Sequence, residues 1–338
     1  MTRNVDQEAD TLATVVARMA RIGSCWSPSF SPDGTRIAFI SDLNGVPQVW
    51  IVPTEGGWPE LVTALDDQIL GVTWSPTGEW LSFNLAPGGG MNAQIYRVRP
   101  DGSDLRRLTD GGKENNLRGA WTHDGKHILM ASNRRGAIGL DAYLLDPETG
   151  TMQLVAELGG IGGINDISRD GRYTALYRVV QRGDSNLYLR ELATGEEHLL
   201  TPHEGPGHFA AAQFSPDGRT LYLLSDDARE RIAFARILLD ADHRPGRIEL
   251  LAGRDAAECE SFALTEDGST AALMWNVAGR SELVFMDLAT GEVTTGPALP
   301  AEMAGSLTFS QDGRMLAMVC NGSVAPQDIW VLDRTTGR

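Results

Sequence analysis

The chain alternates short apolar segments with polar turns, and this alternation recurs seven times along its length. In each copy an apolar or aromatic residue precedes a polar turn, a glycine closes the turn, and a mostly apolar segment follows. The clearest copies are the identical Phe-Ser-Pro-Asp-Gly segments at 30–34 and 214–218. Proline presets φ, Asp tolerates the third turn position, and glycine takes the left-handed conformation that gives two antiparallel strands the correct twist. Each copy therefore predicts a β-hairpin.

The spacing of these hairpins predicts the architecture. Their closing glycines fall at 34, 78, 125, 171, 218, 268 and 313, and a second glycine turn follows in each repeat, as at Pro100-Asp-Gly102. Small antiparallel sheets that repeat every ~40–50 residues are typical of β-propellers. We predict an all-β fold, a seven-bladed β-propeller of four-stranded antiparallel blades over residues 23–338, with a solenoid as the structural alternative. The blades are expected to begin near residues 26, 71, 118, 164, 210, 260 and 306.

The two ends of the chain differ from the repeats. In residues 1–22 the apolar positions 12, 15, 16, 19 and 22 recur at helical spacing, which predicts a short N-terminal α-helix. The last repeat reaches its second turn at 335–337. We therefore expect the outer strand of the last blade to be missing, and we expect the chain to be part of a longer protein.

Composition narrows the functional classes. The net charge of −16 argues against nucleic acid or an anionic membrane surface as a partner. No apolar run approaches the ~18 residues of a membrane helix, and the acidic N-terminus lacks the apolar core of a secretory signal. Three widely separated cysteines, Cys25, Cys259 and Cys320, indicate isolated thiols and a cytoplasmic location.

The sequence contains none of the common catalytic, zinc-binding or phosphate-binding motifs. No window matches the Gly-x-Ser-x-Gly elbow of an α/β-hydrolase. The histidines of His203-Glu-Gly-Pro-Gly-His208 are five apart around Pro and Gly, whereas a helical zinc motif needs a spacing of four. Pro87-Gly-Gly-Gly90 lacks the Lys and the helix of a phosphate loop. We predict no catalytic residue, no metal and no cofactor in this chain.

Long polar loops point to one face of the predicted ring. The loops between second and third strands share a face with those between blades, and both sets are long, whereas the opposite face has only tight turns. Function is expected on the loop-rich face, because binding residues concentrate on loops held by a rigid scaffold. The candidate residues for lining a substrate chamber or a domain interface are Asn92, Glu114, Asn115, Asn116, Arg118, Arg134 and Arg135.

Several segments resemble one protein family. The run Ser29-Phe-Ser-Pro-Asp-Gly-Thr-Arg-Ile-Ala-Phe39, Val46-Pro-Gln-Val-Trp50, Leu105-Arg-Arg-Leu-Thr109 and Leu199-Leu-Thr-Pro-His203 resemble the propeller of prolyl oligopeptidase-family serine peptidases, nearest to the dipeptidyl and acylaminoacyl peptidases. The resemblance implies that a C-terminal α/β-hydrolase domain, absent here, carries a Ser-Asp-His triad. It also implies that the propeller caps that active site and admits short peptides.

Three functions follow for comparison. The first is a non-catalytic, substrate-gating propeller whose partners are an α/β-hydrolase domain of the same polypeptide and short peptides. In that role Arg side chains could fix a peptide carboxylate, and Glu114 could meet a free amine. The second is a stand-alone TolB-like or WD-like propeller that binds a protein. The third is an enzyme with its own site in the pore, such as a lactonase, which needs carboxylates or histidines on the inner strands, where we expect Trp, Phe, Ile, Leu and Ser.

Overall fold

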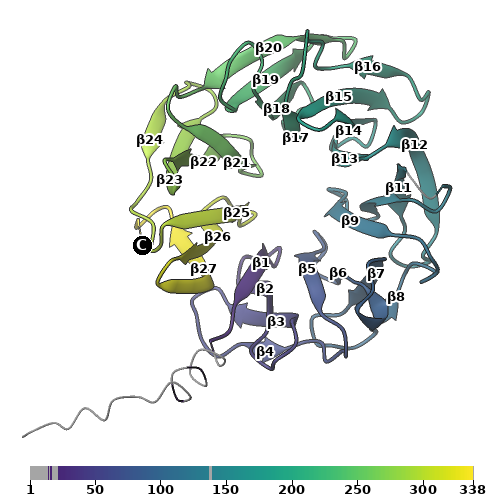
Figure 1. The fold of residues 1–338 in the computed structure, drawn as a ribbon, viewed down its shortest axis with the longest axis vertical. Coiled ribbons are helices and arrows are strands. Elements are labelled where there is room, and N and C mark those ends of the chain that lie inside the picture. The colour runs from purple at the N-terminus through teal and green to yellow at the C-terminus, as the bar shows by residue number, and fades with distance from the viewer. Residues whose placement is uncertain (1–13, 15, 17–21, 137–138, 338) are drawn as a thin grey trace, which may run out of the picture.

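Seven small antiparallel sheets form a closed ring in the computed structural model, which describes residues 14, 16, 22–136 and 139–337 (Figure 1). Six sheets have four strands, and the seventh has three within the described residues. The first strand of each sheet lies nearest the centre of the ring, and the later strands follow outward in chain order (Figure 1). The predicted seven-bladed propeller of four-stranded blades is therefore confirmed. The helix expected in residues 1–22 lies almost entirely outside the described residues and stays a prediction.

The strands have the following bounds. Blades 1 to 3 contain β1 (Cys25–Phe30), β2 (Arg36–Ser41), β3 (Gln48–Pro53) and β4 (Glu60–Leu61); β5 (Ile69–Trp74), β6 (Leu81–Leu85), β7 (Gln94–Val98) and β8 (Arg106–Arg107); and β9 (Asn116–Trp121), β10 (Ile128–Ser132), β11 (Leu140–Leu145) and β12 (Met152–Gly160). A short 3₁₀ turn, η1 (Pro87–Gly89), precedes β7. Blades 4 and 5 contain β13 (Gly162–Ile167), β14 (Tyr173–Gln181), β15 (Asp184–Glu191) and β16 (Glu197–Leu199); and β17 (Phe209–Phe214), β18 (Thr220–Ser225), β19 (Ala233–Leu239) and β20 (Pro245–Ala252). Blades 6 and 7 contain β21 (Glu258–Leu264), β22 (Thr270–Val277), β23 (Arg280–Asp287) and β24 (Val293–Thr295); and β25 (Met303–Phe309), β26 (Met315–Gly322) and β27 (Ala325–Asp333).

The repeated turns join the first and second strands of each blade and hold themselves together. In blade 1, Ser31 Oγ donates to Asp33 Oδ1 at 2.5 Å, and the amide of Arg36 donates back to Ser31 Oγ at 3.0 Å. Gly34 closes the turn at φ 69°, a left-handed conformation that favours glycine. The same Ser/Thr-to-Asp bond recurs in five other blades, and in blade 2 Thr77 replaces the Asp. We call this side of the ring the turn face; it comprises residues 31–34, 75–78, 122–125, 168–171, 215–218, 265–268 and 310–313.

A second repeated device lies on the opposite side. Thr63 Oγ1 donates to Gln48 Oε1 at 2.9 Å and accepts the amide of Val49 at 3.0 Å, which ties the end of the outer strand to the start of the third strand. The same arrangement joins Thr109 to Gln94 and Thr201 to Asn186. This explains the repeated Leu-Thr pairs of the sequence. We call this side the loop face; it includes the loops at 42–47, 86–93, 133–136, 182–183, 226–232, 278–279 and 323–324.

Each innermost strand is irregular where it pairs with the second strand. The register shifts between these two strands in all seven blades. Ser27, Ala211 and Ser306 have φ between 53° and 56° at these points. Bulges of this kind increase local twist and redirect side chains. The irregularity therefore decides which inner-strand side chains reach the centre of the ring.

Apolar clusters fill the seams between neighbouring blades. The seam between blades 4 and 5 contains thirteen buried residues, among them Phe209 and Leu223. Among the residues that the structure describes, the seam that closes the ring, between blades 7 and 1, has three buried apolar members, Phe30, Ile37 and Ala317. Within the described residues no strand pair bridges this seam. Since burying one such side chain stabilises the fold by about 1.5–3 kcal/mol, the closing seam is the weakest of the seven.

Candidate functional site

The polar residues predicted on the loop face form a structural cluster. Gln94 is its centre: its Nε2 donates to the main-chain oxygen of Glu114 at 2.8 Å, and its Oε1 accepts from Asn116 Nδ2 at 3.0 Å. Asn115 Oδ1 accepts the amide of Ala93 at 2.9 Å. The Gln94 side chain, Asn115 Oδ1 and Asn116 Nδ2 are therefore already used by the protein, whereas Glu114 Oε2 is buried without a hydrogen-bond partner.

The other loop-face candidates divide into two groups. Asn92 is exposed at the start of the same cluster. Arg134 and Arg135 are partly exposed and already face carboxylates: Arg135 Nη1 lies 2.6 Å from Glu157 Oε1, and Arg134 Nη2 lies 4.0 Å from Asp110 Oδ2. The structure does not bring these two arginines to the centre of the ring together with Asn115 and Asn116.

Arg118 differs from the other candidates. It lies on β9, the innermost strand of blade 3, and reaches sideways to blade 2, where its Nη1 donates to Thr73 Oγ1 at 2.6 Å. The same nitrogen donates to the main-chain oxygen of Gly119 at 3.0 Å. Burial lowers the pKa of Arg118 to about 10, so it remains charged at neutral pH. Among the described residues no carboxylate lies within ion-pair distance of it.

A second titratable group at the centre of the ring was not predicted. Asp166 lies on β13, the innermost strand of blade 4, so the expectation that inner strands lack carboxylates is wrong. Its Oδ2 accepts the amide of Phe214 at 2.8 Å, and its Oδ1 accepts that of Ile167 at 2.8 Å. His123 Nε2 lies 3.9 Å from Oδ1. Burial, with a smaller contribution from neighbouring Glu266, raises the pKa of Asp166 to about 6 against the lowering effect of the Phe214 amide and His123.

The repeat itself contains the signal that identifies Asp166. The fifth residue before each turn glycine is Ser29, Thr73, Ala120, Asp166, Gln213, Ala263 and Thr308. In blade 1 this position already shows its role, because Ser29 Oγ accepts the amide of Trp74 in the next blade at 2.9 Å. Asp166 makes the same bond with a carboxylate, the one acidic member of the series.

The turn-face end of the pore is crossed by an ion pair. Arg169 Nη2, in the turn of blade 4, lies 2.6 Å from Glu266 Oε1, in the turn of blade 6. Glu266 and His123 also line a cavity of about 250 Å³, together with Trp74 and Phe309. A larger cavity of about 720 Å³ lies among the inner strands of blades 1, 2 and 7. The centre of the ring thus offers enclosed space at the turn face and wider space beyond it.

The histidine-rich loop before blade 5 has a structural role. His203 Nε2 lies 3.1 Å from Asp184 Oδ1, and its Nδ1 lies 2.8 Å from the main-chain oxygen of Thr201. These contacts raise the pKa of His203, the hydrogen bond to Thr201 contributing most. The His203 ring also packs on Phe209 at a centroid distance of 4.8 Å. Through these contacts His203 anchors the loop between blades 4 and 5.

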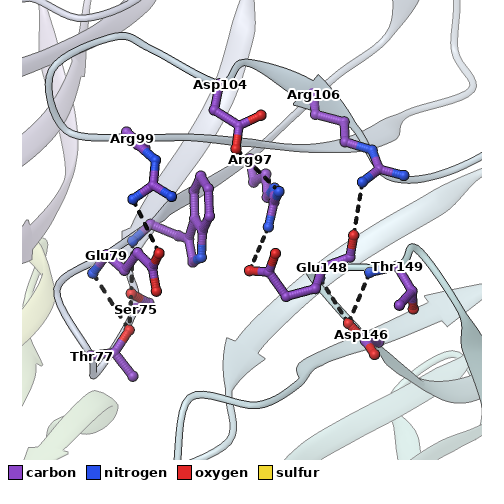
Figure 2. A network of polar contacts seen from close by, with 11 residues as sticks. Ser75, Thr77, Glu79, Arg97, Arg99, Asp104, Arg106, Asp146, Glu148 and Thr149 are labelled. Atoms are coloured by element: carbon purple, nitrogen blue, oxygen red, sulfur yellow. Dashed lines mark hydrogen bonds and ion pairs between the residues drawn. The ribbon is translucent and has the colours of Figure 1, made fainter.

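An ion-pair network on the outer part of the turn face joins blades 2 and 3 (Figure 2). The Arg97 side chain, 5% exposed, lies 2.6 Å from Glu148 of blade 3 and 3.3 Å from Asp104 of its own blade. Arg97 and Arg99 both stack on Trp80, with guanidinium-to-centroid distances of 3.7 and 4.2 Å. Because Arg97 and Arg99 each face a carboxylate and cover the Trp80 ring, this network stabilises the contact between two blades.

No group of three or more His, Cys, Asp or Glu side chains in the described part of the chain is placed to hold a metal ion. Cys25, Cys259 and Cys320 are free thiols. None of the helical segments described in residues 14, 16, 22–136 and 139–337 has the length and hydropathy needed to cross a bilayer.

Comparison with known proteins agrees with the ring and the turns. Residues 9–158 match the family described as the TolB beta propeller domain. Over these residues the chain is similar to TolB-like β-propellers. This propeller has relatives named as peptidases: it is 29% identical over 208 residues to the uncharacterized peptidase YuxL of Bacillus subtilis, and 26% identical over 215 residues to dipeptidyl aminopeptidase BIII of Pseudoxanthomonas mexicana. These alignments cover 59% and 61% of the propeller chain.

The propeller is much shorter than these relatives. The aligned parts are 29% of the Bacillus protein and 31% of the Pseudoxanthomonas enzyme. Among solved structures, a prolyl endopeptidase superimposes on 96% of the propeller with a TM-score of 0.77 and 17% identity. The superposition covers 51% of the endopeptidase chain. This last likeness shows a shared fold.

Proposed function

We propose that this propeller is the substrate-selecting domain of a cytoplasmic serine peptidase, working with an α/β-hydrolase domain of the same polypeptide on short peptides. The relatives named as peptidases support this most directly, because each matches about 60% of the propeller and extends far beyond it. In this proposal the nucleophile, the general base and the oxyanion donors belong to the hydrolase domain. The propeller supplies selection by size and charge.

The cavities at the centre of the ring support selection by size. Volumes of about 250 and 720 Å³ suit a few residues of extended peptide and are far too small for a folded protein. Both cavities are lined by Ser29 and by Thr308, residues of the innermost strands of blades 1 and 7. A peptide that moves between the two cavities would pass these side chains.

The test begins with the whole encoded polypeptide. It should hydrolyse dipeptidyl or acylaminoacyl p-nitroanilides, and a serine-directed inhibitor should abolish that activity, whereas residues 1–338 alone should be inactive. Hydrolysis by residues 1–338 alone, or a whole polypeptide that lacks peptidase activity, contradicts the proposal.

Selection by the ring requires a second measurement. Thr308→Trp, which fills space at the junction of the two cavities, should slow cleavage of hexapeptides more than cleavage of a dipeptidyl anilide. Thr294→Trp makes the same substitution on the exposed outer strand β24 and should leave the ratio unchanged. If both variants change the ratio equally, the central cavities do not select substrates.

A stand-alone binding scaffold is the second candidate, favoured by the match of residues 9–158 to the TolB family. The reading frame after Arg338 separates the two candidates. A further hydrolase sequence with Gly-x-Ser-x-Gly supports the peptidase, and a stop codon supports the scaffold.

A further inference from the structure

The repeat makes Arg118 exceptional. The seventh residue before each turn glycine lies on the innermost strand, at or next to the irregular register. These residues are Ser27, Gly71, Arg118, Ile164, Ala211, Ser261 and Ser306. Six of the seven are small, hydroxylated or aliphatic, and one carries a charge. The fold does not need an arginine at this position.

The surroundings of Arg118 leave its charge unbalanced. Its hydrogen-bond acceptors are neutral, the Thr73 hydroxyl and the Gly119 carbonyl, and its Nε is buried without a partner. Placing a charge away from water without a counter-charge is costly, so buried arginines are normally paired with carboxylates. Arg97, which is comparably enclosed, has two carboxylates. Arg118 has none within the described residues.

One edge of the guanidinium remains accessible. Nη2 has no hydrogen-bond partner among the described residues, and unlike Nε it is not closed off from solvent. It lies beside Gly71: a Cβ there would be 3.5 Å from Nη2 and 3.2 Å from Ser27 Oγ, so the glycine adds no side-chain atom between Nη2 and Ser27. Thr73, which anchors the guanidinium, lines the cavity of about 720 Å³ together with Ser27 and Val72.

We propose that Arg118 is a carboxylate-binding residue next to the central cavity that Thr73 lines, with Nη2 as the donor and Thr73 holding the guanidinium in place. A carboxylate at Nη2 would supply the missing counter-charge and accept a charge-assisted hydrogen bond. That the carboxylate belongs to a peptide rests on the proposed function, and its source is either the C-terminus or an acidic side chain. The chain has a net charge of −16 and therefore repels anions in general. The positive charge of Arg118 would attract a carboxylate locally in spite of that repulsion.

Binding to the 338-residue chain tests this proposal without any hydrolase activity. The ligands are trialanine as free acid or as amide, and the capped peptides acetyl-Ala-Asp-Ala-amide and acetyl-Ala-Asn-Ala-amide, measured by calorimetry. We expect wild type to bind at least one carboxylate peptide more tightly than its neutral counterpart. Arg118→Gln should weaken that binding by about tenfold or more, the range expected for a hydrogen bond between charged groups. The pair of ligands that shows the difference identifies the source of the carboxylate.

Two further variants separate ligand binding from a structural role. Thr73→Val removes the anchor but keeps the charge, so it should lower the thermal midpoint while retaining the preference for carboxylate over neutral peptide. Arg247→Gln changes an exposed arginine of the outer strand β20 and should bind as wild type does. Equal affinity of wild type for charged and neutral peptides, or unchanged binding by Arg118→Gln, overturns the carboxylate site. Neither result bears on the peptidase proposal, which is tested separately by the hydrolysis of p-nitroanilides.

Discussion

Replacing Asp166 by Asn removes a carboxylate that the fold holds at an energetic cost. Its pKa rises from 3.8 to about 6, so the native state binds this proton more tightly than the unfolded chain does. The contribution of Asp166 to stability is therefore fully present below about pH 4 and is lost as pH rises through about 6. Two pKa units correspond to about 3 kcal/mol.

The magnitude expected in the variant follows from the contacts. Asp166 accepts amides from Phe214 and Ile167, and an Asn oxygen can keep one of these bonds. The lost bond should cost about 1 kcal/mol at every pH, so it cancels when one protein is compared with itself at two pH values. His123 lowers the pKa of this carboxylate and so opposes burial in part, whereas Glu266 raises the pKa and adds to the effect of burial.

The assay is urea unfolding followed by tryptophan fluorescence at pH 4.5 and pH 7. Between these pH values, wild type should lose about 2 kcal/mol more of its free energy of unfolding than Asp166→Asn does, because at pH 4.5 the unfolded aspartate is already mostly ionised. Asp255→Asn, on an exposed loop, is the matched control and should follow wild type. If Asp166→Asn has the same pH dependence as wild type, burial does not perturb this carboxylate, and the reasoning fails.

Three other substitutions test the fold. Asp217→Asn weakens the self-contained turn of blade 5, in which the Ser215 hydroxyl contributes most to the lowered pKa of Asp217. The variant should lose about 1 kcal/mol at pH 7 and approach wild type as pH falls below the ordinary range of an aspartate, because the lowered pKa stabilises only the ionised form. A loss that does not shrink on acidification contradicts this. Gly150→Ala places a Cβ 2.8 Å from the main-chain oxygen of Leu108 at φ 75° and should cost about 2 kcal/mol in urea unfolding, whereas a neutral result would show that the turn relaxes. Phe83→Ala empties the seam between blades 1 and 2 and should cost about 3–5 kcal/mol; a loss below 1 kcal/mol would mean that the seam collapses around the gap.

The architecture was predictable because its determinants are local. Each turn contains its own Ser or Thr, Asp and Gly, and the spacing of these turns depends on chain length alone. The same reasoning located the loops of the loop face but did not predict that their polar side chains are hydrogen-bonded within the protein. Asn115 and Asn116 look like ligand-binding residues in the sequence, yet their side chains bond to residues about 22 positions earlier.

The charged groups at the centre could not be placed from single repeats. Whether Arg118 meets a carboxylate depends on blade 2, and whether Asp166 is buried depends on blade 5, each about 45 residues away in the chain. Only an alignment of the seven repeats with one another marks both positions as charged members of otherwise uncharged columns. Such an alignment shows which residues differ from the other repeats at the same position. These differences occur at positions where the fold accepts several residue types.

The apolar seams between neighbouring blades differ in size, so one joint of the ring should open before the others. Six joints are filled by broad apolar clusters, while the joint that brings the last blade against the first relies on Phe30, Ile37 and Ala317 and on a few partly buried neighbours. Separating blade 7 from blade 1 exposes the least apolar surface, so partial unfolding should begin at that joint. The other blades would then remain packed against one another as an open arc. Amide protons of β1 and β27 would then exchange with solvent before those of β14 and β15, on the opposite arc of Figure 1.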